Sequence, residues 1–164
     1  MIYLDMDGVI CDFVKGALAL HRVPAKLADA MQWDMPKHIG IDETLFWMPF
    51  DFEFWRDLPE TPEFNAIMAH VRCKNYYILT TPPPVHCEEA IEGKREWLGK
   101  RGIFNVKFAQ RKYMLMKPGD ILIDDADHNV DAARLHGFDA RLVPRPWNRS
   151  AGTPVDIDAL FEGV

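Results

Sequence analysis

The sequence predicts an α/β fold: a Rossmann-like parallel five-stranded sheet flanked by helices, with a small helical cap inserted after the first strand. Short apolar runs rich in β-branched and aromatic residues recur along the chain. Stretches with helical spacing lie between them, and this alternation is typical of a parallel sheet covered by helices. A gap of roughly 40 residues after the first run is far longer than a usual strand-to-helix connection, which predicts the cap.

Each expected element follows from its own apolar pattern. Buried strands are expected at residues 2–4, 76–79, 121–123 and 141–143, with a weaker fifth strand at 106–109. Helical spacing predicts one helix over about residues 85–101. A second is expected between the runs at 121 and 141, with Val130, Ala133 and Leu135 as its inner positions.

These elements divide the chain into a core and an insertion. We expect residues 1–12 and about 60–164 to form the core, and about 13–59 to form the cap. The cap is rich in aromatic residues, namely Trp33, Phe46, Trp47, Phe50, Phe52, Phe54 and Trp55. Most of these rings are expected to pack the cap, and a minority could line a pocket for a flat ligand.

Composition narrows the class of protein. A net charge of −6 provides no general attraction to a polyanion, so we expect no long nucleic acid as partner. The three cysteines lack metal-ligand spacing and are expected to be reduced thiols. No apolar run approaches the roughly 20 residues that span a bilayer, and the first residues lack the pattern of a signal peptide. We therefore expect a cytoplasmic protein without a membrane partner, and we leave a homodimer open.

Two aspartates directly after the first strand form the strongest chemical signal. Asp5 and Asp7 are separated by one residue, and Gly8 permits a tight bend after them. This spacing can direct both carboxylates toward one pocket, where their charge must be neutralised. An oxygen-only ligand set favours Mg²⁺ over zinc. The alternative is a surface turn with two solvated acids.

A second acidic pair, Asp124 and Asp125, follows the strand expected at 121–123. Ligands of open parallel sheets bind beyond the carboxyl ends of the strands, so acids from two strand ends could share one metal. The alternative is that these acids cap the helix that follows.

Thr80 and Thr81 follow another strand. A hydroxyl and the amides of a turn are suitable donors to a phosphate there, although turn capping explains these residues equally well.

The ordered motifs resemble those of the haloacid dehalogenase superfamily of phosphohydrolases. They are Asp5-x-Asp7-Gly8-Val9, Thr80 after an apolar strand, a following lysine, and Asp124-Asp125 after another strand. The resemblance implies that Asp5 is the nucleophile that becomes an aspartyl-phosphate and that Asp7 is the general acid/base. It also implies a Mg²⁺ ion that contacts Asp5, the backbone carbonyl of Asp7 and one of the later pair, with Asp125 favoured.

The superfamily pattern also requires a lysine that bridges the nucleophile and the phosphate. Lys112 is our first choice, because it follows the weak strand and precedes the next strong one. Lys94 and Lys117 are the competitors. Lys94 is otherwise expected on a solvated helix face, and Lys117 in a turn.

Within the superfamily, the chain is more similar to the 5'(3')-deoxyribonucleotidases and their bacterial and phage relatives. This likeness rests on residues 5–13, 54–59, 79–82 and 122–125, together with Lys94 and Trp97. It implies a nucleoside monophosphate substrate whose base is held by aromatic residues of the cap. Phe13 is the best candidate for this contact, and Trp33 and Trp47 are weaker ones. Thr81 and Lys94 are further candidates for substrate binding.

We therefore expect a Mg²⁺-dependent phosphomonoesterase that acts on a small 5'- or 3'-nucleotide. A phosphatase of another small phosphate, such as a sugar phosphate, is the nearest alternative. A module that binds a nucleotide without hydrolysing it is an alternative from another class, but such a module would not need an acid/base at Asp7. Trimming of DNA ends is disfavoured by the acidic charge balance.

Overall fold

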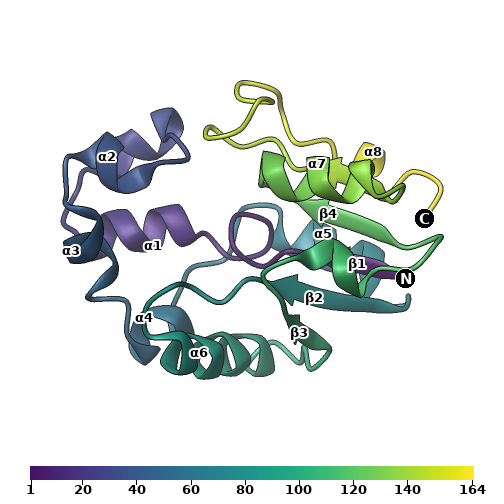
Figure 1. Ribbon diagram of the computed structural model, residues 1–164, viewed down its shortest axis with the longest axis horizontal. Helices are drawn as coiled ribbons and strands as arrows, with labels where there is room; N and C mark the ends of the chain where they lie inside the picture. Colours follow the sequence, from purple (N-terminus) through teal and green to yellow (C-terminus); the bar gives the residue numbers. More distant parts are fainter.

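The computed structural model describes residues 1–164 and contains one five-stranded parallel sheet (Figure 1). Its strand order is β3-β2-β1-β4-β5. The strands are β1 (Ile2–Leu4), β2 (Tyr76–Thr80), β3 (Val106–Phe108), β4 (Ile121–Asp124) and β5 (Asp139–Leu142). This confirms the predicted fold class, including the weak fifth strand.

The last strand begins earlier than predicted. Residues 141–143 were the expected run, but β5 pairs with β4 from Asp139 onward, with Asp139 opposite Ile121 and Leu142 opposite Asp124. Asp139 is exposed at the start of an edge strand. An apolar pattern therefore misses it, because backbone pairing and not burial places it in the sheet.

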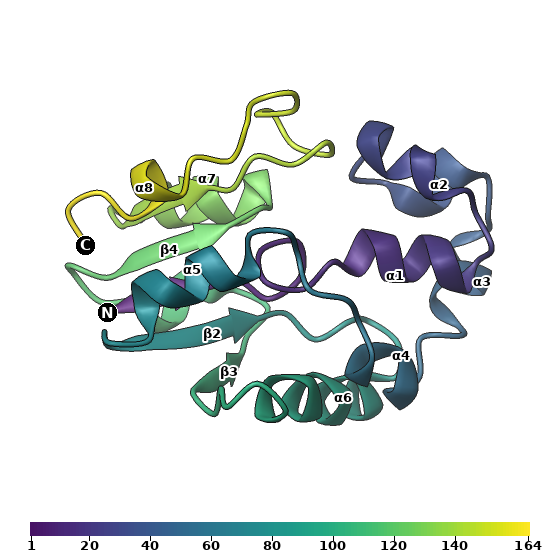
Figure 2. The ribbon, with the colours of Figure 1, turned by 180° about the vertical axis from the view of Figure 1, so that it is seen from behind.

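The two sheet faces carry alternate residues of each strand, as the two-residue period of a strand requires. Ile2, Leu4, Ile78 and Ile123 join the larger buried cluster, together with α5 (Phe64–Val71), α6 (Cys87–Gly99) and α8 (Ile157–Leu160). Tyr3, Leu79, Leu122 and Ala140 pack on the other side against α7 (Asp127–Leu135) and Met116, which follows η2 (Lys112–Leu115). Figure 2 shows α5 lying across the sheet.

Helix α7 corrects one predicted core position. Val130 and Ala133 are fully buried as expected, whereas Leu135 is 84% exposed. Val130 and Ala133 are three residues apart and share one helix face, but Leu135 follows Ala133 by two residues and so points to the opposite side.

The segment predicted as a cap is helical. It contains α1 (Phe13–Leu20), η1 (Ala25–Ala30), α2 (Met35–Ile39), α3 (Glu43–Trp47) and α4 (Phe52–Arg56). Aspartate side chains accept hydrogen bonds from the first turn of each of the four α-helices, which explains how such short helices begin. None of the helices is both long and apolar enough to cross a bilayer.

The cap leaves and rejoins the core at adjacent points. The Asp12 N–H donates to the Pro59 carbonyl at 2.8 Å. Figures 1 and 2 show α1, α2 and α3 beyond the carboxyl ends of the strands. Cap residues Phe46, Phe50 and Trp55 are buried in the same cluster as sheet residues. The cap therefore packs directly on the core, and its boundaries near residues 13 and 59 stay a prediction.

Candidate active site

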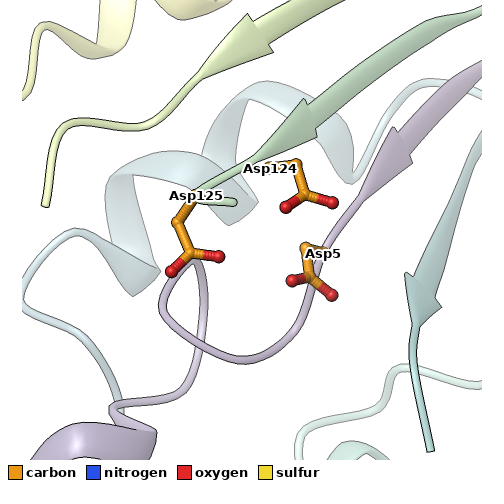
Figure 3. A group of neighbouring side chains, drawn as sticks. All are labelled: Asp5, Asp124 and Asp125. Carbon is orange, nitrogen blue, oxygen red and sulfur yellow. The ribbon is translucent and has the colours of Figure 1, made fainter. Parts of the chain in front are cut away.

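Parallel pairing brings the two acidic pairs together. Leu4 of β1 pairs with Ile123 of β4, and the Asp5 N–H donates to the Ile123 carbonyl at 2.9 Å. Consequently Asp5, Asp124 and Asp125 lie side by side (Figure 3). Each offers a carboxylate oxygen within 4.8 Å of the others, and all three side chains are buried.

The loop after β1 depends on Gly8. This residue has a φ of +74°, and a Cβ atom there would lie 2.2 Å from Asp125 Oδ2. The N–H groups of Ile10 and Cys11 both donate to the Met6 carbonyl, at 2.9 and 3.0 Å, which closes the turn. Only glycine combines this backbone conformation with such a close approach of a carboxylate.

Lys112 lies at the expected nucleophile. Its Nζ is 2.6 Å from Asp5 Oδ1 and 2.7 Å from Asp124 Oδ2, and the residue is 2% exposed. Lys117 is exposed. Of the lysines considered, Lys112 is therefore the one that the fold brings to Asp5.

Lys94 is also buried, contrary to the solvated position considered for it. It forms an ion pair with Asp7 and donates to Thr80 Oγ1 at 2.9 Å and the Thr81 carbonyl at 3.3 Å. Its ammonium also lies 4.6 Å from the centre of a Trp55 ring. Lys94 lies on the buried face of α6 with Ala90, Trp97 and Leu98. A lysine is rarely buried without a partner, and its partner Asp7 is far away in the chain, so nothing in the sequence indicated burial.

Asp7 has a third partner in Cys11, whose Sγ donates to Asp7 Oδ1 at 3.3 Å. Burial, with the nearby Asp7 charge, raises the pKa of Cys11 well above its ordinary value. The thiol therefore stays protonated and acts as a donor that orients Asp7. Cys11 is one of three cysteines without a disulfide.

The charges at the carboxyl ends of β1 and β4 do not balance. Burial raises the pKa of Asp5 to about 7 against the opposing effect of Lys112, and burial with Asp5 and Asp124 raises the pKa of Asp125 well above its ordinary value. Burial alone would lower the pKa of Lys112, but Asp124 and Asp5 overcome that effect and raise it. Three buried carboxylates around one ammonium fit a hard divalent cation with oxygen ligands, of which Mg²⁺ is the typical case.

A cavity of about 360 Å³ opens onto these groups from the cap. Asp5, Asp7, Lys112 and Asp125 lie at its core side, and Phe13, Trp33 and Trp47 line its cap side. Thr81 also lines it, although its hydroxyl donates to the Ala109 carbonyl at 3.1 Å. Thr80, Lys94 and Asp124 are fully buried and do not line this cavity, so Lys94 lies against Asp7 rather than at the cavity wall.

Several further lining residues are not among the predicted site residues. Gln32, Gln110, His128, Asn129 and Trp147 belong to this group. Trp33 packs edge-on against His128, with ring centres 5.0 Å apart, which joins the cap to the start of α7. Trp147 donates its indole N–H to Asp125 Oδ2 at 2.6 Å. Nothing in the sequence spacing relates Trp147 to Asp125.

A family model described as 5' nucleotidase, deoxy (pyrimidine), cytosolic type C protein matches residues 1–153. The chain belongs to this nucleotidase family. Solved structures of haloacid dehalogenase-like hydrolases share the fold of this chain. The chain is thus a phosphoric monoester hydrolase. No curated protein matches it significantly.

Three solved structures illustrate how far the fold likeness extends. L-2-haloacid dehalogenase from Xanthobacter autotrophicus is 12% identical, with a TM-score of 0.58 over 97% of this chain and 86% of that one. The putative hydrolase YfnB from Bacillus subtilis, described as bound to magnesium, is 12% identical, with a TM-score of 0.54 over 87% and 85%. A predicted phosphatase from Clostridium acetobutylicum is 12% identical, with a TM-score of 0.52 over 92% and 87%. At these identities the likeness shows the fold of the nucleotidase and not its substrate.

Proposed function

We propose that this nucleotidase is a Mg²⁺-dependent phosphatase of 5'- or 3'-nucleoside monophosphates, with deoxyribonucleotides as its preferred class. One observation carries the proposal: the cavity joins the Asp5 and Lys112 pair at one end to the aromatic rings of the cap at the other. A phosphate at the first end would leave a base among the rings. The description of the family model, which names deoxy and pyrimidine, supports the same class.

The residues support a reaction in two displacements. Asp5 attacks phosphorus and forms an aspartyl-phosphate, while the bond to the ester oxygen breaks and that oxygen takes a proton from Asp7. Asp7 then accepts a proton from the water that attacks the aspartyl-phosphate, which releases phosphate and restores Asp5. Lys112 offsets charge on the phosphoryl oxygens.

Mg²⁺, when bound, would neutralise the carboxylates and the phosphoryl charge. Asp5, the backbone carbonyl of Asp7 and Asp125 would hold it, with Asp124 as the alternative to Asp125. Lys94 and Cys11 hold Asp7 in place for its two proton transfers.

We also propose a cytoplasmic location, since the exposed free thiols of Cys73 and Cys87 suit a reducing compartment.

A substrate panel tests the proposal. Phosphate release is measured with 5'- and 3'-monophosphates of deoxyribo- and ribonucleosides, with sugar phosphates and with a short phosphorylated oligonucleotide, each with and without Mg²⁺. We expect monomeric nucleotides to be hydrolysed fastest and EDTA to abolish turnover. Asp5→Asn is the control variant and should be inactive. Equal rates for nucleotides and sugar phosphates would reject the aromatic base site, and full turnover by Asp5→Asn would reject the nucleophile.

A further inference from the structure

The segment that follows β5 holds Asp125 in a fixed orientation. Trp147 donates its indole N–H to Asp125 Oδ2 at 2.6 Å. The next residue, Asn148, donates from Nδ2 to the carbonyls of Asp125 and Val143, each at 2.8 Å. Both the side chain and the backbone of Asp125 are therefore tied to this segment.

The two oxygens of Asp125 have different surroundings. Oδ2 lies between the indole of Trp147 and the backbone of Gly8, where an added Cβ would come within 2.2 Å of it. No protein group donates a hydrogen bond to Oδ1. Figure 3 shows one Asp125 oxygen directed toward Asp5 and Asp124 and the other turned away from them. Asp125 thus has one oxygen available to a cation.

Asp124 differs from Asp125, because protein donors occupy both of its oxygens. Oδ1 accepts from the Ala126 N–H at 2.9 Å and from Asn129 Nδ2 at 3.2 Å. Oδ2 accepts from Lys112 at 2.7 Å and from Asn129 at 3.1 Å. Of the adjacent acids, Asp125 is the one with an oxygen left for a metal.

We propose that Trp147 is a positioning residue that limits Asp125 to one free oxygen and thereby favours Mg²⁺ over Ca²⁺. Mg²⁺ takes six ligands in near-ideal octahedral geometry, whereas Ca²⁺ takes six to eight and often binds both oxygens of a carboxylate. An indole N–H is neutral, donates only and does not ligate a metal, so it blocks Oδ2 without competing for the cation. The inference rests on the proposed function for the identity of the metal site.

The test compares metal affinities of the wild type with those of Trp147→Phe, which keeps an aromatic ring and removes the N–H. Metal-free protein is titrated with MgCl₂ and separately with CaCl₂. The shifts in melting temperature yield apparent dissociation constants for each metal. Loss of a group that orients a metal ligand typically costs about 10- to 100-fold in affinity. We expect Mg²⁺ affinity to fall about tenfold and Ca²⁺ affinity to fall less or rise, because Oδ2 becomes available.

Two further variants separate this effect from a packing defect. Trp147→Met also lacks a donor but fills the space differently, so it should lower the Mg²⁺ to Ca²⁺ affinity ratio as well. Trp97→Phe is the matched control: its indole donates to the Leu58 carbonyl at 2.6 Å in the core, and its loss should lower the melting temperature without changing the ratio. A ratio unchanged in both Trp147 variants, or lowered equally by Trp97→Phe, overturns the inference.

The same experiment distinguishes the inference from the function on which it rests. If the wild type binds Mg²⁺ in a Trp147-dependent way but releases phosphate from no nucleotide, the proposed function fails and the inference stands. If the wild type hydrolyses nucleotides with Mg²⁺ and the Trp147 variants keep its metal preference, the inference fails alone.

Discussion

Asp5 and Asp7 have different surroundings, although one residue separates them. The Asp5 side chain is 9% exposed and pairs with Lys112, whereas the Asp7 side chain is 27% exposed and is held by Lys94 and Cys11. A buried nucleophile beside an ammonium and a more accessible acid/base agree with the proposed roles, since Asp7 must exchange protons with an ester oxygen and with water.

Replacement of Lys112 should impair both turnover and stability. Lys112→Met leaves Asp5 and Asp124 without their cation, so we expect turnover to fall at least about 100-fold and the free energy of unfolding to fall by about 3–5 kcal/mol. Steady-state kinetics and urea denaturation measure these effects. Lys117→Met is the matched control and should change neither. Equal losses in both variants would contradict the assignment of Lys112 as the bridging lysine.

The raised pKa of Asp5 makes stability depend on pH in the metal-free protein. Folding raises this pKa from 3.8 to about 7, so between these pH values the folded protein retains a proton that the unfolded chain has released. The contribution of Asp5 to stability therefore falls as pH rises from about 4 to about 7. Protons also compete with Mg²⁺ for the carboxylate.

Melting curves recorded between pH 5 and pH 8 test this dependence, with and without Mg²⁺. We expect the metal-free melting temperature to fall as pH rises from 5 to about 7, and the stabilisation by Mg²⁺ to grow over the same range. Asp5→Asn should weaken both trends. A Mg²⁺ effect that is independent of pH would contradict the prediction.

At the scale of elements, helix α6 connects the cap to the catalytic acids. Its Gly93 packs against α4, where a Cβ would lie 2.7 Å from the Phe52 carbonyl and from Trp55 Cβ. The next residue, Lys94, reaches Asp7 and Thr80. Adjacent residues of α6 therefore contact the cap and the site: Gly93 packs on α4, and Lys94 binds Asp7.

Two glycines of α6 provide a matched test of this contact. Gly93→Ala should destabilise the protein by about 1–3 kcal/mol, because the added methyl meets backbone atoms that cannot move freely. Gly99→Ala meets nothing closer than 3.9 Å and should be neutral or stabilising by about 0.5–1 kcal/mol, since alanine favours the helix. Urea denaturation compares the two. Equal effects would mean that α6 and α4 can separate without cost.

At the scale of the whole molecule, the cavity lies between the cap and the core. Trp33 of the cap packs edge-on against His128 of α7 across it, and Trp33 is 57% exposed. Phe13 has a different environment, because it stacks on Trp47 and Trp55 inside the cap. Replacement of Trp33 should therefore change substrate binding and have little effect on folding.

Trp33→Ala should raise the KM for a nucleoside monophosphate by at least about fivefold, since stacking on a base is worth about 1–3 kcal/mol. The KM for p-nitrophenyl phosphate, which lacks a base, should change much less. Leu45→Ala is the control, because Leu45 is equally exposed on the cap but does not line the cavity. A KM for both substrates that stays at the wild-type value would exclude Trp33 from the base site.

Some features of this protein were predictable because their signals are local. The strands begin with the continuous apolar runs at residues 2–4, 76–79 and 121–123, and the two acidic sites directly follow the first and the last of these runs. Since parallel strands bring their carboxyl ends to one edge, the meeting of Asp5 with Asp124 and Asp125 follows from the fold class. The helical cap follows from an insertion too long for a loop.

Other features depended on the tertiary structure, because they join segments whose sequences carry no shared pattern. The burial of Lys94 beside Asp7 depends on how α6 packs, and the exposure of Leu135 depends on which face of α7 meets the sheet. Trp147 reaches Asp125 from 22 residues farther along the chain. The sequence by itself determined the fold class and the acids of the site. Only packing decided which acid keeps a free oxygen, because hydrogen-bond partners are set by distance in space and not by spacing in the chain.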